Sequence, residues 1–144
     1  MSTLTNLLVQ HEGKTLEFKR DVSSPDKLIK TVVAFANGAG GTLLVGVEDR
    51  TRRVCGVADP TRVEEQLANL ISDRIEPRLV PELQLLPWRK THVIAVRVFP
   101  SSTRPHSVKA LGPMQGVYVR VGSTNRPADP SQIEEMRRFV RGHT

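Results

Sequence analysis

The apolar run at residues 42–47 (TLLVGV) constrains the fold more than any other segment of this chain. A strand that is apolar on both of its faces is expected where other elements cover both sides of a sheet. The run therefore predicts a central strand, in a sheet with helices packed on it.

Three predicted helices begin with the same pattern, a short polar residue followed by proline. The pairs are Ser24-Pro25, Asp59-Pro60 and Asp129-Pro130. A polar N-cap accepts a hydrogen bond from a free first-turn N–H group, and proline at the next position loses nothing because its N–H would be unpaired anyway. Apolar residues at helical spacing follow each pair, with Ile75 in the second stripe before Pro77 ends it. A short helix at the N-terminus is also expected, around Leu4, Leu7 and Leu8.

Strand patterns lie between the helices. Residues 15–19 alternate between apolar and charged, and residues 54–57 are expected to form a hairpin with the central run. Residues 79–86 and 92–98 flank a turn at 87–90 and indicate a second hairpin. One or two more strands are expected before the last helix, and in the one at residues 116–121 we expect three residues inward and two outward: Val117, Val119 and Val121 against Tyr118 and Arg120.

This order of elements is typical of an α+β fold with a mixed or antiparallel sheet and packed helices. The chain has 144 residues, the usual length of one domain, so we expect residues 1–144 to form a single domain. No apolar run approaches the ~20 residues that span a bilayer, so we expect no membrane contact. Cys55 is the only cysteine, which fits a reducing compartment, and we predict a cytoplasmic protein.

The charge balance is basic, with 21 Lys and Arg against 15 Asp and Glu, and fifteen of the basic residues are arginine. Arginine matches the geometry of phosphate better than lysine does. A nucleic-acid partner and an ordinary basic surface are both compatible with this balance.

The glycine cluster and the histidines do not indicate a phosphate-binding loop or a zinc site. The glycine cluster at residues 38–41 is predicted to cap a helix and form a turn, because phosphate loops run from strand to helix and here the helix comes first. The four histidines do not pair with one another or with Cys55 at metal-ligand spacing, so no zinc site is expected.

Three acidic residues form the main candidate site. Glu17 lies inside the first predicted strand, Asp49 follows the central strand, and Glu12 precedes Glu17 by five positions. If the two strands are neighbours, the carboxylates converge and could bind Mg²⁺ or Mn²⁺, which favour oxygen ligands. Alternatively, Glu12 and Asp49 are solvated loop acids and Glu17 pairs with a nearby arginine.

The segment at residues 119–126 is a second candidate, because arginines flank a Gly-Ser-Thr-Asn turn. Backbone N–H groups, hydroxyls and arginines can all bind phosphate oxygens, although a plain turn before a helix has the same composition. Arg50, Arg52 and Arg53 form a basic turn, which is either a solvated tip or part of an electrostatic footprint.

Together these segments resemble the Schlafen AlbA-like (AlbA_2) domain family. The matching motifs run in order along most of the chain: Glu12-x-x-x-x-Glu17-Phe18-Lys19, Ala34-Phe35-Ala36-Asn37-x-x-Gly40-Gly41, Leu44-x-Gly46-Val47-x-Asp49, and Tyr118-Val119-Arg120-x-Gly122-Ser123-x-Asn125-x-x-Ala128. The resemblance implies the fold of that family and a role with nucleic acids.

The resemblance also implies roles for single residues. In animal Schlafens, duplicated copies form a clamp that cleaves tRNA and rRNA, and the acids of that endoribonuclease fall on Glu12, Glu17 and Asp49 of this chain. These would be the catalytic residues and the ligands of Mg²⁺ or Mn²⁺. The expected nucleic-acid contacts are Lys19, Arg20, Arg52, Arg120, Ser123 and Arg126.

The chain departs from animal Schlafens in lacking the residues for their structural zinc and in carrying one copy of the domain, so a clamp would require a homodimer. We expect a nucleic-acid-binding domain that acts on structured RNA as a metal-dependent endoribonuclease. The alternatives are a non-catalytic DNA-binding or regulatory module and a protein-interaction domain.

Overall fold

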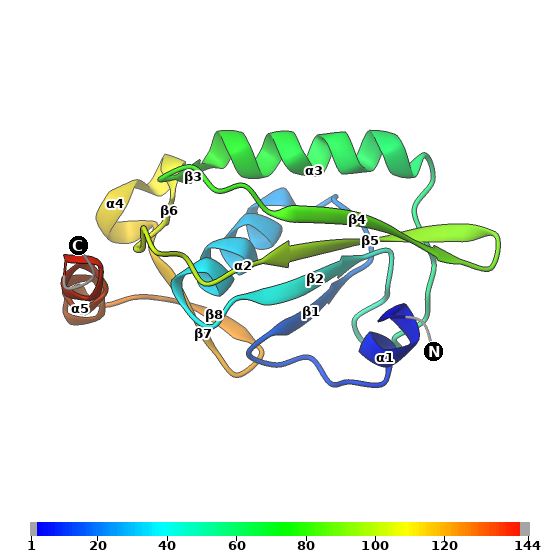
Figure 1. Cartoon of the computed structure of the whole chain (residues 1–144), viewed down its shortest axis with the longest axis horizontal. Coiled ribbons are helices and arrows are strands. Elements are labelled where there is room, and N and C mark those ends of the chain that lie inside the picture. Colours follow the sequence, from blue (N-terminus) through cyan, green and yellow to red (C-terminus); the bar gives the residue numbers. More distant parts are fainter. Residues whose placement is uncertain (1–2, 142–144) are drawn as a thin grey trace.

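The computed structural model describes residues 3–141 and contains both helices and strands (Figure 1). The helices are α1 (Thr3–Leu8), α2 (Pro25–Asn37), α3 (Pro60–Arg74), α4 (Gly112–Gln115) and α5 (Pro130–Arg141), with a short 3-10 turn η1 (Lys109–Leu111) before α4. The strands are β1 (Leu16–Lys19), β2 (Gly41–Val45), β3 (Ile75–Glu76), β4 (Glu82–Trp88), β5 (Thr91–Val98), β6 (Ser107–Val108), β7 (Tyr118–Val121) and β8 (Thr124–Pro127).

The main sheet has the strand order β1-β2-β5-β4. Strands β1 and β2 are parallel, whereas β5 is antiparallel to both β2 and β4. This confirms the predicted α+β fold with a mixed sheet, and it makes β1 and β2 neighbours, which is the arrangement needed for the acids to converge. Two short two-stranded sheets, β3-β6 and β7-β8, lie outside the main one.

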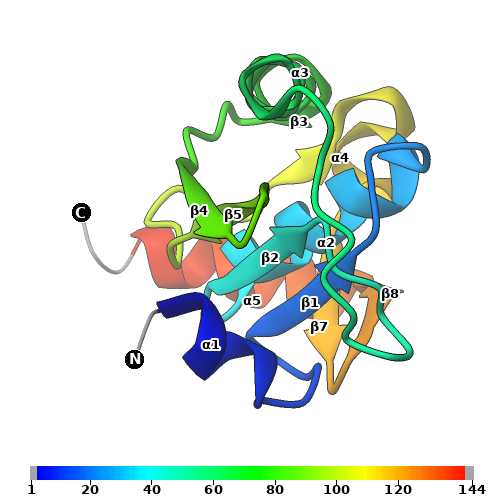
Figure 2. The same cartoon turned by 90° about the vertical axis from the view of Figure 1, so that its right-hand side faces the viewer.

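Helices cover both faces of the main sheet (Figure 2). Helices α2 and α3 pack on one face through an apolar cluster that includes Phe35, Leu43, Leu67 and Ile94. On the opposite face α1 contributes Leu4 to a second cluster with strand residues. The predicted burial of the central strand on both faces is therefore correct: β2 supplies Leu43 to one cluster and Leu44 to the other. Among residues 3–141, no helix combines the length and the apolar content needed to span a bilayer.

The predicted strand boundaries need correction at several points. Residues 54–57 do not form a strand, because their pairing with the segment after β2 is a single bridge between Val47 and Val54. Ile75 is outside helix α3 and pairs with Val108 as part of β3. The β4–β5 hairpin is present, and Pro87 and Trp88 belong to β4 and not to the turn. Sequence patterns did not predict β3, β6, η1 or α4.

The three predicted N-caps differ. Asp129 accepts a hydrogen bond from the Gln132 N–H at 2.8 Å, and the Gln132 side chain accepts one from the Asp129 N–H at 2.9 Å, a reciprocal cap. Ser24 and Asp59 make no side-chain cap hydrogen bond, so their predicted capping role is wrong, although a proline follows each at the helix start. The glycine cluster forms the predicted turn, in which Gly40 has a φ of +78° and donates its N–H to the Phe35 carbonyl at 2.9 Å.

Candidate functional site

The parallel pairing of β1 and β2 brings the predicted acids to one end of the sheet. Glu17 lies in β1 opposite Leu43 of β2, and both strands lead into loops at the same end. Asp49 lies in the loop after β2 and is exposed. Loops at the ends of rigid strands commonly position functional groups.

Glu12 lies along the outer edge of β1, next to the single bridge that joins Gly13 to Leu16. Its Oε2 accepts a hydrogen bond from the Phe18 N–H at 2.9 Å. Because β1 is an edge strand, Phe18 has no strand partner on that side, and the carboxylate supplies the missing acceptor. Glu12 is therefore held by the backbone of the strand that carries Glu17.

The pKa of Glu12 responds to both of the other acids. Burial, a side-chain hydrogen bond with Glu17, and the charges of Glu17 and Asp49 raise the pKa of Glu12 to about 7, although the Phe18 N–H opposes the shift. A proton shared by two carboxylates removes their repulsion. Glu12 and Glu17 are thus joined by a side-chain hydrogen bond, whereas Asp49 contributes only the smallest of these effects, through its charge.

Glu17 also has a positive partner, because its Oε1 lies 2.9 Å from Nη2 of Arg120. The two side chains are only 12% and 2% exposed, respectively. The Arg120 guanidinium also lies 5.1 Å from the centre of the Phe35 ring. Its further hydrogen bonds go to the Gly13 and Leu16 carbonyls and to Oδ1 of Asn125, at 3.0, 3.3 and 2.9 Å.

These contacts correct the sequence prediction for Arg120, which was expected to face outward and bind phosphate. The two faces of β7 pack against different helices. Tyr118 packs in the cluster with α2, while Val117 packs in a third cluster with α5. Arg120 shares the face of Tyr118 and is buried, whereas Val121, expected inward, is 48% exposed. Arg120 is therefore the counter-ion of Glu17, as the alternative interpretation of Glu17 anticipated.

The acids as placed do not form a ready metal cage. Within the part of the chain that the structure describes, no three His, Cys, Asp or Glu side chains form a group that could hold a metal ion. Glu17 is engaged by Arg120, and Glu12 by the Phe18 N–H and by Glu17. Arg120 neutralises Glu17 as a bound cation would, whereas Glu12 has a backbone donor and a second carboxyl group beside it and no cation.

The turn after β2 carries a group of arginines beside the acids. Glu48 donates its N–H to the Arg53 carbonyl at 2.9 Å, and Arg52 donates its N–H to the Glu48 carbonyl at 2.9 Å. At the base of the turn, Gly46 has a φ of +110°, and a Cβ there would approach the Gly56 backbone to 3.2 Å. These contacts fix a turn from which Arg50 and Arg53 are exposed. We call residues 48–54 the basic turn.

The other predicted nucleic-acid contacts fall into two groups. Lys19, half-buried, and Arg20, exposed, follow one another at the end of β1, and the half-buried Arg52 of the basic turn bonds Nδ1 of His11. Ser123 and Arg126 are exposed on the β7–β8 hairpin instead, with Ser123 in its turn. The first group therefore lies by the ends of β1 and β2, and the second lies on a separate hairpin.

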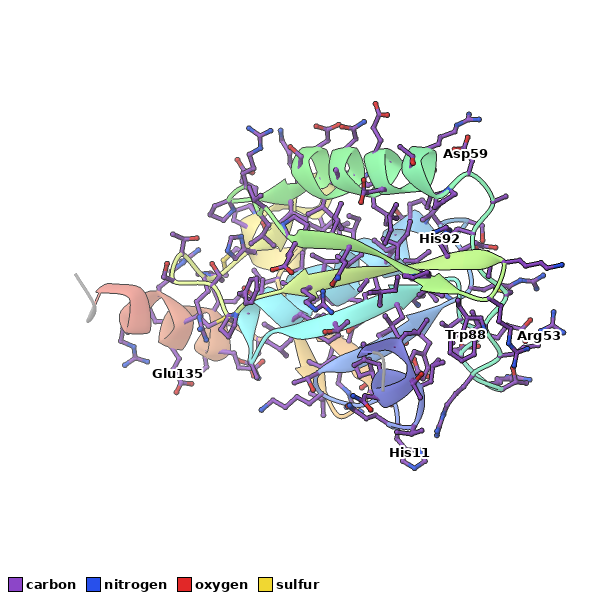
Figure 3. The ribbon with its side chains drawn as sticks, turned by 45° about the vertical axis from the view of Figure 1, so that its right-hand side comes forward. His11, Arg53, Asp59, Trp88, His92 and Glu135 are labelled. Carbon is purple, nitrogen blue, oxygen red and sulfur yellow. The ribbon has the colours of Figure 1, made fainter. Side chains whose placement is uncertain are left out.

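Sequence analysis did not single out Trp88, which ends β4 and is half-buried. Arg89 places its guanidinium 5.7 Å from the centre of the Trp88 ring. Figure 3 shows Trp88 at the end of the molecule where Arg53 of the basic turn lies. The available signal was that the only tryptophan of the chain precedes Arg89 and Lys90.

Comparison with known proteins gives one family and several similar structures. The family model described as Schlafen, AlbA_2 matches residues 12–129. One similar structure is the N-terminal domain of a protein from Nitrosomonas europaea whose name relates it to the ATP-dependent DNA helicase RecG. The match has 30% identity and a TM-score of 0.67, and covers 89% of this chain and 94% of that one.

A second similar structure is the DIP2311 protein from Corynebacterium diphtheriae. It has 25% identity and a TM-score of 0.65 over 87% of this chain, which corresponds to 24% of that protein. No match was found among curated proteins.

Proposed function

Because this chain belongs to the Schlafen AlbA_2 family, we propose that it is a nucleic-acid-binding domain. The observation that carries the proposal is the basic turn, which presents Arg50, Arg52 and Arg53 at the end of the sheet where the acids meet. Arginine forks bind phosphate oxygens through paired, charge-assisted hydrogen bonds. The similarity to a protein named after a DNA helicase supports the same class of ligand.

The contacts follow from this placement. Arg20, Arg50, Arg52 and Arg53 contact the phosphate backbone, together with Lys19 at the end of β1. Ser123 and Arg126 contact a more distant part of a long ligand. Arg120 is excluded from the contact surface because its guanidinium is buried and bonded to Glu17.

The ligand we favour is structured RNA, on the strength of the Schlafen motifs, and DNA is the alternative favoured by the RecG-related structure. Fluorescence anisotropy with a labelled RNA hairpin and a DNA hairpin of the same sequence separates the two. We expect micromolar or tighter binding at low salt, and a log–log slope of affinity against salt near −0.9 for each duplex phosphate neutralised. Absence of binding to both probes at low salt would overturn the proposal.

A second function, metal-dependent RNA cleavage, is favoured by one specific observation, the hydrogen bond between the side chains of Glu12 and Glu17. We propose this activity as a narrower form of the binding function, with Mg²⁺ or Mn²⁺ as the cofactor. In the structure Glu17 pairs with Arg120, so the acids would have to leave their present partners to bind a metal. We therefore propose that the metal site forms in the complex with nucleic acid and not in the free protein.

The cleavage test uses purified protein with tRNA and Mn²⁺. The variants are Glu12→Gln and Asp49→Asn, because removal of Glu17 would also leave Arg120 buried without its partner. Asp59→Asn, an exposed acid at the start of α3, is the matched control. We expect the first two variants to lose cleavage and the control to retain it, whereas equal cleavage by all four proteins would indicate a contaminant.

A clamp built from single-copy domains would be a homodimer, and this too is a proposal. Light scattering over a concentration series measures the mass with and without RNA. A monomeric mass both with and without RNA would contradict the proposed homodimer and leave the protein with a single binding face.

A further inference from the structure

We propose that Trp88 and the basic turn form a binding site for single-stranded nucleic acid, in which an unpaired base stacks on the indole ring. This inference rests on the proposed nucleic-acid-binding function and specifies the form of the ligand. The site is made by two turns that are distant in sequence, residues 48–54 after β2 and residues 89–90 between β4 and β5.

Trp88 lies at the edge of the main sheet, next to a hairpin turn. It is the last residue of β4, an edge strand of the main sheet, and it pairs with Thr91 across the hairpin turn. Its ring is half-buried against the apolar cluster on the α1 face, to which Val54 of the basic turn also belongs. Trp88 and Val54 therefore pack on the same cluster, and Figure 3 shows Arg53 at the same end of the molecule.

Exposed positive charges lie at the same end of the molecule as the Trp88 ring. Arg50 and Arg53 are exposed on one side of this end, and Arg89 and Lys90 are exposed on the hairpin turn. The acids of the basic turn offset only part of this charge, since Glu48 pairs with Arg53 at a distance of 4.0 Å and the Arg53 side chain stays 74% exposed. An aromatic ring among cations is the composition of surfaces that bind single strands.

One face of the indole ring is in contact with a cation. The Arg89 guanidinium lies over it at 5.7 Å, within the range of a cation–π contact. Arg89 is exposed and has a φ of +52°, so it belongs to the turn and is not packed in the core. A base that stacks on Trp88 takes the place of the guanidinium, which then becomes available to a phosphate.

The chemistry of the ring selects the ligand. Bases inside a duplex are already stacked on one another, so a tryptophan side chain stacks with bases in loops, bulges, ends or single strands. A protein partner could also use an exposed tryptophan beside arginines. The excess of positive charge around Trp88 favours a polyanion, and a single-stranded one because of the ring.

The test uses the fact that Trp88 is the only tryptophan of the chain, so tryptophan fluorescence, excited at a wavelength that tyrosine does not absorb, reports on this site alone. Wild-type protein is titrated with a twelve-nucleotide oligouridylate, its oligothymidylate equivalent and a blunt duplex. We expect saturable quenching by the single strands and much weaker quenching by the duplex. Anisotropy of end-labelled oligonucleotides measures binding independently of the ring.

Two variants sharpen the test. Trp88→Leu keeps apolar bulk against the cluster and should weaken single-strand binding about 5- to 150-fold, the range for one stacked base. Arg97→Ala, which removes a cation at the other end of the same hairpin, is the matched control and should bind within about twofold of wild type. If Trp88→Leu does not fold, as judged by circular dichroism, quenching of the wild-type protein decides the question.

The outcomes separate this inference from the proposed function. Anisotropy that reports binding while Trp88 fluorescence is unchanged and Trp88→Leu binds normally would overturn the stacking site and leave nucleic-acid binding intact. Binding of the duplex as tightly as the single strands, with equal quenching, would overturn the single-strand preference. No binding of any probe at low salt would overturn both proposals.

Discussion

Two groups of arginine lie near the acidic cluster, and they have opposite environments. Arg120 is buried, bonded to Glu17 and in contact with the Phe35 ring. The basic turn holds Arg50 and Arg53 in solvent, with only a long contact from Arg53 to Glu48. Removing a buried counter-ion affects stability, whereas removing an exposed cation affects association with a polyanion.

The same residue type therefore has two different environments in this chain. Arg120 joins the β7–β8 hairpin to the edge of β1, and Asn125, which accepts its hydrogen bond, donates in turn to Thr31 of α2 at 2.8 Å. This network holds the strand that carries Glu17. In the basic turn, Arg52 bonds Nδ1 of His11, whereas Arg50 and Arg53 are exposed and therefore accessible to a ligand.

The largest expected effect is on stability and comes from Arg120→Ala. Leaving Glu17 buried without its partner should lower the free energy of unfolding by about 3–5 kcal/mol. Urea denaturation measures the change. Arg126→Ala, on the paired strand but exposed, is the control and should stay within about 0.5 kcal/mol of wild type. A loss below about 1 kcal/mol for Arg120→Ala would contradict the structural role.

The next effect is on binding and comes from the double variant Arg50→Ala/Arg53→Ala. We expect weaker nucleic-acid binding at low salt and a salt slope that is shallower by about 2, one for each lost phosphate contact. Its stability should be nearly unchanged. The matched control is Arg137→Ala/Arg138→Ala on α5, which removes the same charge from another exposed surface. Equal losses in both double variants would show that net charge, and not the basic turn, determines binding.

A smaller effect is expected in the pH dependence of stability, through Glu12. The pKa of Glu12 is about 7 in the folded protein, whereas the ordinary value of a glutamate is 4.5. As the pH falls, the folded state therefore binds this proton at a higher pH than the unfolded state does. The free energy of unfolding therefore gains a contribution as pH falls from about 7 to about 4.5, and loses it as pH rises again. Glu12→Gln should remove this contribution in urea denaturation at several pH values. Parallel profiles for both proteins would contradict the raised pKa.

The smallest effect tests whether the three acids act on one another. Asp49 is the weakest of the neighbours that raise the pKa of Glu12, so Asp49→Asn should lower that pKa slightly. A carbon-detected NMR titration of the Glu12 carboxyl measures it. Asp59→Asn is the control and should leave the pKa of Glu12 unchanged.

The patterns that were predicted correctly depend on local spacing. The apolar run at residues 42–47 identified a doubly covered strand, and the alternation at 15–19 placed Glu17 in the strand beside it. The motifs of the family gave the order and identity of the acids. Parallel pairing placed Glu17 in the strand next to the one that leads to Asp49.

The patterns that were misread depend on contacts distant in sequence. The alternation of residues in β7 does not predict which face of the strand lies against Glu17, because helices cover both faces. The partners of Arg120 lie in β1 and in the loop before it, far away in the sequence. The predicted N-caps show the same limit. The Asp129 side chain caps its helix and forms a reciprocal pair with Gln132, whereas Ser24 makes no side-chain cap hydrogen bond. Trp88 could not be singled out from the sequence, because Val54 and the rest of the basic turn pack on the same cluster as Trp88 only in the folded chain.

The central claim is that nucleic acid binds at the end of the sheet that carries the basic turn. Amide NMR spectra of nitrogen-15-labelled protein, recorded during titration with a short RNA, test it most directly. We predict that the largest shift changes fall on residues 48–54 and 88–90, with little change in α5. Changes concentrated on α5, or none at saturating RNA, would contradict the account.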